Sequence, residues 1–274
     1  MSISAPRYAA GPVQLRGRLH RTLAILFREL QERAGAGTWF VMALTYATVV
    51  LTVVLGALFA PPGGASLSTF YSPFSSPAWP FLVLIVTTAV GSGAIADDLG
   101  NRSITLYLSR PIHLTDYLAA KASAVGVFIA LAAIGPGVAG IVVLAGLGSI
   151  SATLALSAIG AFIAVGLVTV VFFTGLAVAL SSLSTKPLYA GVGIFGATFA
   201  AEISAETIGG VTGGTSIRYL GPFQDVQAAA TGAFQTGASG TIDPLGASFL
   251  LLGAGILLLL GAWIRLARVE VVGE

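Results

Sequence analysis

The sequence predicts an all-α integral membrane protein with six transmembrane helices and an amphipathic interfacial helix ahead of the first one. Apolar side chains make up 56% of the 274 residues, and charged side chains only 9%. Soluble domains are about 45–50% apolar and about 25% charged. A soluble chain of this length would have too few charges to cover its surface, and the mean hydropathy of +0.94 agrees with a membrane location.

Six apolar segments account for most of the chain. Crossing the hydrocarbon core takes about 20 helical residues, and the segments cover about 39–60, 79–96, 122–147, 154–180, 188–205 and 246–264. We expect a transmembrane domain over 39–264, a cytoplasmic leader and interfacial helix over 1–38, and a cytoplasmic tail over 265–274. Proline at position 136 removes a helical hydrogen bond and predicts a break in the third span.

The segment before the first span is amphipathic. Leu15, Leu19, Leu23, Leu26 and Leu30 recur every three or four residues and form one stripe at helical spacing. Arginine and glutamate side chains occupy the opposite face. A basic helix with a leucine stripe is typical of helices that lie among lipid headgroups. The alternative is a soluble amphipathic helix that packs on a partner.

The distribution of basic residues predicts that both termini are cytoplasmic. Six spans bring the two ends of the chain to the same side, and basic residues accumulate on the cytoplasmic side of membrane proteins. With the amino terminus inside, the outer segments hold only Arg218 of the 13 Lys and Arg residues. The stretch between the second and third spans is then cytoplasmic.

That stretch, DDLGNRSITLYLSRPIHLTDYLAAK, is called the 97–121 segment below. It carries six charged side chains in a chain that has few. An unpaired charge in hydrocarbon costs several kcal/mol, so we expect the segment to lie outside the membrane. We interpret it as the surface on which a soluble partner pushes.

Several kinds of chemistry are not expected of this chain. No GxxxxGK[ST] loop is present, so the chain is not expected to hydrolyse ATP, and HExxH and GxSxG are also missing. The chain has no cysteine and two histidines that lie far apart in sequence. We therefore expect no catalytic residue and no metal site. The net charge of +2 is too small to indicate a nucleic-acid partner.

Glu202 is the single charged residue inside the predicted spans. Acids within a membrane mark ion pathways in carriers, so Glu202 is a candidate polar residue on a transport path. The alternative is a carboxylate that reaches the outer interface or caps a packing contact. One acid gives little support to an ion-coupled carrier and favours a transporter driven by an outside energy source.

The 97–121 segment resembles the loop between the second and third spans of ABC-2 type transporter permeases. In that family an acidic residue leaves the span, and a leucine-rich turn, Ser-Arg-Pro-Ile and Tyr-Leu-x-x-Lys follow. The last two pieces match residues 109–112 and 117–121 here. Many relatives have Gly-Thr where this chain has Arg102-Ser103. The predicted topology of the whole chain is similar as well.

The resemblance implies the ABC-2, or type V exporter, fold and a role as the six-span permease subunit of an ABC transporter, most simply an exporter. Such a chain is not an enzyme: two copies of a separate ABC ATPase subunit would hold ATP and Mg²⁺. A second permease half, expected to be an identical copy, would complete the transporter in the plasma membrane. Spans that carry almost no charge favour a hydrophobic or amphipathic substrate.

Within the 97–121 segment the resemblance implies a short coupling helix held in a cleft of the ATPase. The expected coupling residues are Asp97, Asp98, Arg102, Ser103, Leu106, Leu108, Ser109, Arg110, Pro111, Tyr117 and Lys121. The leucines would be held by the partner, and Arg102 and Arg110 would pair with its acids. The alternative is a solvated loop whose arginines only enforce topology.

Two other functions stay open at this point. One is a membrane scaffold or assembly factor without transport, and the other is an ion-coupled carrier that uses Glu202. The pattern of Phe223, Val226 and Ala230 predicts a short helix over 222–234 on the outer side. Glycines allow helix backbones to approach in lipid, which makes two groups candidates for a dimer face: Gly191, Gly193 and Gly196, and Gly246, Gly253 and Gly261.

Overall fold

The computed structural model describes residues 18–60, 64–101, 113–212, 215–237 and 242–272. All the regular secondary structure within these residues is helical, and six helices are long and apolar enough to cross a membrane. The predicted all-α class and number of spans are confirmed. The candidate spans are Ala36–Leu58, Ala78–Gly100, Leu114–Gly146, Ala152–Ser182, Pro187–Thr212 and Pro244–Arg268.

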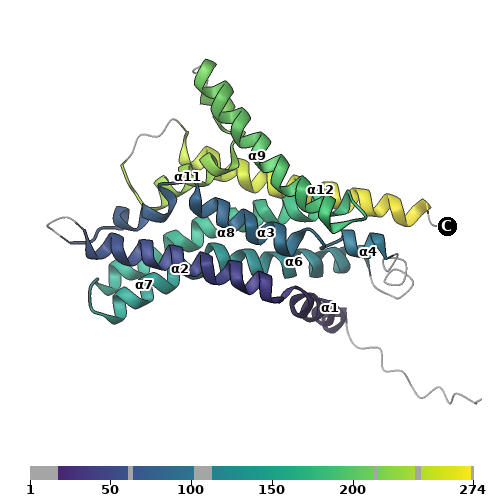
Figure 1. The fold of residues 1–274 in the computed structure, drawn as a ribbon, viewed down its shortest axis with the longest axis horizontal. Coiled ribbons are helices and arrows are strands. Elements are labelled where there is room, and N and C mark those ends of the chain that lie inside the picture. Colours follow the sequence, from purple (N-terminus) through teal and green to yellow (C-terminus); the bar gives the residue numbers. More distant parts are fainter. Residues whose placement is uncertain (1–17, 61–63, 102–112, 213–214, 238–241, 273–274) are drawn as a thin grey trace, which may run out of the picture.

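The elements carry the labels of Figure 1. In chain order they are α1 (Arg18–Arg33), α2 (Ala36–Leu58), the 3₁₀ helix η1 (Leu67–Phe74), α3 (Ala78–Gly91), α4 (Ala96–Gly100), α6 (Leu114–Ala133), α7 (Gly135–Gly146), α8 (Ala152–Ser182), α9 (Pro187–Thr212), α10 (Thr215–Arg218), α11 (Pro222–Ala233) and α12 (Pro244–Val272).

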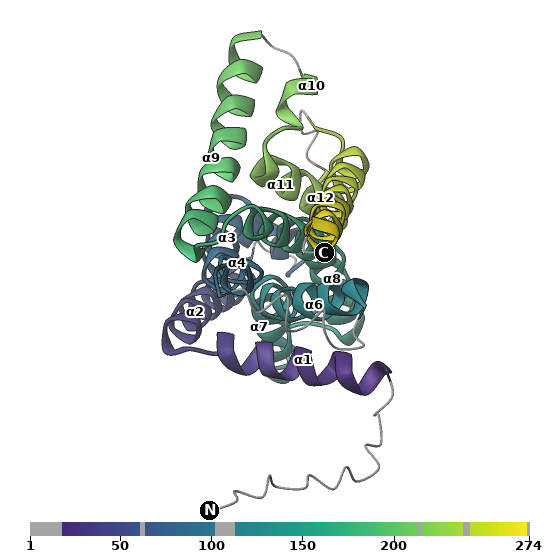
Figure 2. The ribbon, with the colours of Figure 1, turned by 90° about the vertical axis from the view of Figure 1, so that its right-hand side faces the viewer.

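The long helices run side by side along one axis, and α1 lies across one end of them (Figures 1 and 2). That end is called the α1 end, and the opposite one the α11 end. Helix α1 packs on α6. Its packing face is centred on Ile25 and Glu29, which are buried, and includes only part of the leucine stripe: Leu30 packs against the core, whereas Leu23 is 47% exposed. The interfacial position of α1 stays a prediction.

Helix α8 forms the centre of the bundle and contacts α6, α7 and α12. Its closest approach to α12 joins two glycines: a Cβ added to Gly175 would lie 2.3 Å from the Gly255 carbonyl oxygen. Small residues let backbones approach in this way in membranes. Neither glycine was among the predicted dimer-face candidates. Four of those candidates meet open space in the single chain, and their place in a dimer face stays a prediction: Gly193, Gly196, Gly253 and Gly261.

An aromatic cluster fills the α11 end. The Phe74 ring lies 4.5 Å from that of Trp79, 5.6 Å from that of Phe162 and 5.4 Å from that of Phe234, measured between centroids. These residues come from η1, α3, α8 and the end of α11. The cluster therefore ties the two connections at this end, residues 59–77 and 213–243, to the central helix.

Two of the spans are broken. The third breaks at Ile134, between α6 and α7, next to the proline from which a break was predicted. The second breaks over residues 92–95, between α3 and α4, which the sequence did not predict. Helix α6 also begins at Leu114, ahead of the predicted start of the third span at 122, so that Lys121 is helical and buried.

Helix α9 ends at Thr212, later than the predicted end of the fifth span near 205. The additional turns persist because α10 packs on them. The stem of Arg218 lies over Gly209, where an added Cβ would be 2.7 Å from Arg218 Cγ. Helix α9 leans away from the other spans toward the α11 end (Figures 1 and 2). The short helix predicted over 222–234 is observed as α11.

Candidate functional site

The two ends of the 97–121 segment meet at the α1 end of the bundle. Asp97 and Asp98 lie on α4, and Tyr117 and Lys121 lie on α6. The other predicted coupling residues lie outside the described residues, so their arrangement is not addressed: Arg102, Ser103, Leu106, Leu108, Ser109, Arg110 and Pro111.

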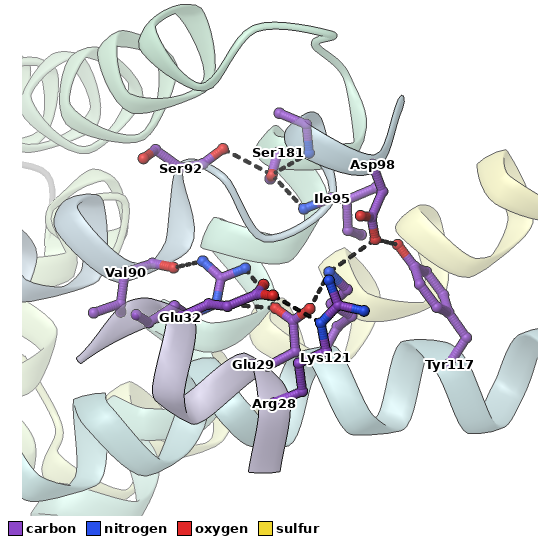
Figure 3. A network of polar contacts seen from close by, with 12 residues as sticks. Arg28, Glu29, Glu32, Val90, Ser92, Ile95, Asp98, Tyr117, Lys121 and Ser181 are labelled. Atoms are coloured by element: carbon purple, nitrogen blue, oxygen red, sulfur yellow. Dashed lines mark hydrogen bonds and ion pairs between the residues drawn. The ribbon is translucent and has the colours of Figure 1, made fainter. Parts of the chain in front are cut away.

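Asp98 joins these two ends through two contacts on the same oxygen. Lys121 Nζ lies 2.8 Å from Asp98 Oδ2, and the Tyr117 hydroxyl donates a hydrogen bond to that oxygen over 2.6 Å (Figure 3). A hydroxyl–carboxylate distance this short is typical of a charge-assisted hydrogen bond. Because Lys121 and Tyr117 are buried, the segment leaves and re-enters the bundle at one fixed point.

A second carboxylate attaches α1 to this point. Glu29 Oε1 lies 2.5 Å from Lys121 Nζ, and both side chains are only 3% exposed. Arg33 donates to Glu29 Oε2 from Nη2 at 2.8 Å and from Nε at 3.2 Å. Its Nη1 also donates to the Val90 carbonyl on α3. We call Glu29, Arg33, Asp98, Tyr117 and Lys121 the Lys121 network; it connects α1, α3, α4 and α6.

The charges of the Lys121 network balance. Two carboxylates, Glu29 and Asp98, face two cations, Arg33 and Lys121. Buried charges are tolerated when each has a partner with good geometry, and removing one partner leaves an uncompensated charge that costs about 3–5 kcal/mol. Asp97 stays exposed in the first turn of α4, where an acid interacts favourably with the helix dipole.

At the α11 end, the predicted path residue Glu202 contacts the start of a neighbouring helix. Its Oε2 accepts a hydrogen bond from the Phe223 backbone N–H over 2.9 Å, and Gln224 contributes hydrogen bonds from its backbone and its side chain. The first N–H groups of a helix have no partner within the helix. The Glu202 carboxylate, on α9, is the acceptor for such an N–H group at the start of α11. This hydrogen bond ties the two helices together.

The comparison with protein families decides the relationship. The model of a family described as "ABC-2 family transporter protein" matches residues 57–269. The chain belongs to this family. The comparison with curated proteins returns no match. The resemblance drawn from the 97–121 segment is confirmed, and the chain is a multi-pass membrane protein and a permease of the ABC-2 transporter family.

In this ABC-2 permease a serine on α8 forms hydrogen bonds with the backbone groups that the break in the second span leaves unpaired. The backbone N–H groups of Ile95 and Ala96 donate to Ser181 Oγ over 2.9 and 3.0 Å, and the Ser181 hydroxyl donates to the Ser92 carbonyl over 2.9 Å (Figure 3). These are groups that an unbroken helix would have paired internally. Ser181 therefore holds α4 at a fixed angle to α3, next to the Lys121 network.

Sequence reasoning missed three residues that position the 97–121 segment: Glu29, Arg33 and Ser181. Glu29 and Arg33 have the spacing of an ordinary surface pair on a helix, and nothing local shows that a lysine far along the chain completes them. The signal for Ser181 is similarly weak, because serines in transmembrane helices commonly bond their own backbone. Only the packing of α8 against the break reveals the role of Ser181.

Proposed function

We propose that this ABC-2 permease is one half of an exporter and that the 97–121 segment couples it to a separate ATPase. The main support is the Lys121 network. It fixes both ends of the segment to one point and connects that point to the second span, to the third span and to α1. A loop that only enforced topology would not need a buried ion pair across its base.

The network suggests how a push on the segment would move the permease. A force applied to residues 102–112 enters through α4 and α6 together, because Asp98, Tyr117 and Lys121 join those helices. Glu29 passes it to α1. The Ser181 hydrogen bonds pass it to α8, which contacts most of the bundle. The break between α3 and α4 is the place where the angle between the segment and the span can change.

The rest of the proposal concerns partners. Two copies of the ATPase bind ATP and Mg²⁺, and this chain contributes no catalytic residue. A second, identical permease half packs against outward faces of α9 and α12, which carry open glycines and exposed apolar side chains such as Leu188, Val192 and Leu257. Both termini lie in the cytoplasm and the transporter in the plasma membrane, so the α1 end is the inner end and the α11 end the outer one.

The test is association with the candidate ABC ATPase subunits of the same organism. Wild-type permease in lipid nanodiscs is compared with Leu106→Asp and Arg110→Glu, and both binding and stimulation of ATP hydrolysis are measured. Breaking a buried interfacial charge pair costs about 2–5 kcal/mol, so Arg110→Glu is expected to weaken binding by at least tenfold. Arg268→Glu is the matched control, because it reverses an exposed arginine at the same end.

The outcomes separate the proposed function from the alternatives. Binding and stimulation that are lost in both segment variants and kept in Arg268→Glu support coupling through the 97–121 segment. Binding without stimulation by the wild type indicates a scaffold. No binding by a folded wild type would sink the permease–ATPase proposal.

A further inference from the structure

An open cavity of about 1110 Å³ lies at the α11 end, between α9 and the starts of α3 and α11. At this end α9 leans away from the other spans (Figure 2). Small-molecule sites usually have about 300–1000 Å³, so this cavity has room for a ligand of drug size or somewhat larger. None of the contacts of the Lys121 network reaches it, and the coupling role of that network leaves it unexplained.

One wall of the cavity is aromatic. Phe81, Phe199 and Phe223 line it. The Phe199 ring lies 5.9 Å from that of Phe81 and 6.0 Å from that of Phe223, both edge to face. Three rings held against one another by such contacts form a rigid apolar surface. Aromatic faces attract cations through their quadrupole as well as apolar groups.

The polar part of the wall is acidic. Glu202 and Glu206, one helical turn apart on α9, both line the cavity, and Arg218 is its one basic lining residue. Glu202 is half-buried, and its bond to the Phe223 backbone aims the carboxylate toward the start of α11. The carboxylate therefore sits at a fixed place beside the aromatic wall.

A third carboxyl lies behind Glu202. Asp225 is 1% exposed, and neither of its oxygens has a hydrogen-bond partner among the described residues. The negative charge of Glu202 disfavours ionisation of Asp225. A positive ligand charge beside Glu202 would compensate the Glu202 carboxylate, whereas a negative ligand charge would add to the negative charge already there.

We propose that this cavity is a binding site for an amphipathic organic cation, whose apolar body packs on Phe81, Phe199 and Phe223 and whose charge lies beside Glu202 and Glu206. The lining charges sum to one negative charge, and carboxylates beside aromatic rings recognise ammonium-type ions. Gln224, which lines the same wall, supplies a hydrogen-bond partner for a polar head. The inference that such a ligand is transported rests on the proposed function. The inference that the ligand binds here does not.

The test uses tetraphenylphosphonium, an aromatic cation, and tetraphenylborate, an anion of the same shape. The chain has no cysteine, so Gln227→Cys introduces one thiol at the cavity for maleimide labelling in detergent. We expect tetraphenylphosphonium to slow labelling of this thiol and tetraphenylborate to do so at least tenfold more weakly. Gln31→Cys, exposed on α1 at the other end, is the matched control and should label at an unchanged rate.

The carboxylates are tested in the Gln227→Cys background. Glu202→Gln keeps a hydrogen-bond acceptor for α11 while removing the charge, and Glu206→Gln changes an exposed side chain. Each change should weaken protection by tetraphenylphosphonium about three- to tenfold, and Glu32→Gln should leave it unchanged. An unaltered thermal unfolding midpoint shows that the variants are folded.

Equal protection by the two ions, or protection that survives loss of both carboxylates, would overturn the proposal. So would an absence of protection in the folded Gln227→Cys protein that keeps both carboxylates. The measurement needs no ATPase. A permease that binds the cation but no ATPase would refute the proposed function and leave the site standing, and the reverse result would refute the site alone.

Discussion

Lys121 and Asp98 form an ion pair, 2.8 Å from Nζ to Oδ2, across the base of the 97–121 segment. Both are among the coupling residues predicted from the sequence, and they lie at the two ends of the segment. We expect them to act by holding these ends together. Their substitution is expected to change both the stability of the permease and its coupling.

Lys121→Met removes the one cation that contacts both Glu29 and Asp98. Two buried acids then lose a partner, and we expect the free energy of unfolding to fall by about 3 kcal/mol or more. Thermal unfolding in detergent measures this. Lys186→Met, which removes an exposed lysine, should change stability by less than about 1 kcal/mol. Equal effects of the two substitutions would contradict a central role for Lys121.

Ser181→Ala removes the oxygen that accepts from Ile95 and Ala96 and the donor to Ser92. Buried backbone groups left without a partner cost about 1–3 kcal/mol, so a lower unfolding midpoint and weaker stimulation of the ATPase are expected. Ser182→Ala is the matched control. Ser182 is equally buried but donates only to the Ala179 carbonyl of its own helix. The idea fails if Ser182→Ala is as harmful as Ser181→Ala.

Gly175→Ala places a methyl group against the backbone of α12, 2.3 Å from the Gly255 oxygen. The two central helices must separate, and overpacking of this kind costs about 1–3 kcal/mol. Gly160→Ala faces open space on the same helix, α8, and should be neutral or stabilising by about 0.5–1 kcal/mol. Unfolding midpoints of the two variants that move in the same direction would be inconsistent with this packing.

Asp225→Asn tests a buried carboxyl. Burial, with a smaller contribution from Glu202, raises the pKa of Asp225 to about 8. Between about pH 4 and pH 8 the folded chain keeps a proton that the unfolded chain releases, so this group makes the protein less stable as the pH rises through that window. The variant should flatten the decline in unfolding midpoint between pH 5 and pH 8 and unfold at a higher temperature at pH 8. Glu32→Gln, on the exposed face of α1, should leave the slope unchanged.

The fold class and the number of spans are predictable from the sequence because lipid leaves few alternatives. A long apolar segment in hydrocarbon must satisfy its own backbone, and a helix does so. The family is predictable because residues 109–112 and 117–121 keep a local pattern that needs no tertiary information. The break at Ile134 has a local cause as well, in the proline at position 136.

The candidate site was predictable only in its location. The composition of the 97–121 segment predicts a solvated connection with exposed charges. Lys121 is nevertheless buried, because the carboxylates of Glu29 and Asp98 compensate its charge. That compensation comes from a different helix, so no window of sequence contains it. The turns of α9 beyond residue 205 were missed for a related reason: their threonines and glycines are typical of a loop, but these turns pack against α10 and are helical.

The pairing of Glu29 with Lys121 also orders events while the chain is being synthesised. Glu29 leaves the ribosome well before Lys121, which arrives only with the third span. Glu29 has two cationic partners, Arg33 and Lys121. Until Lys121 has been made, Glu29 can pair only with Arg33. Helix α1 can therefore take its final place only after α6 has been made. We expect the basic residues before the first span to set its orientation at an earlier stage. The ion pair between Glu29 and Lys121 would then stabilise a topology that is already established.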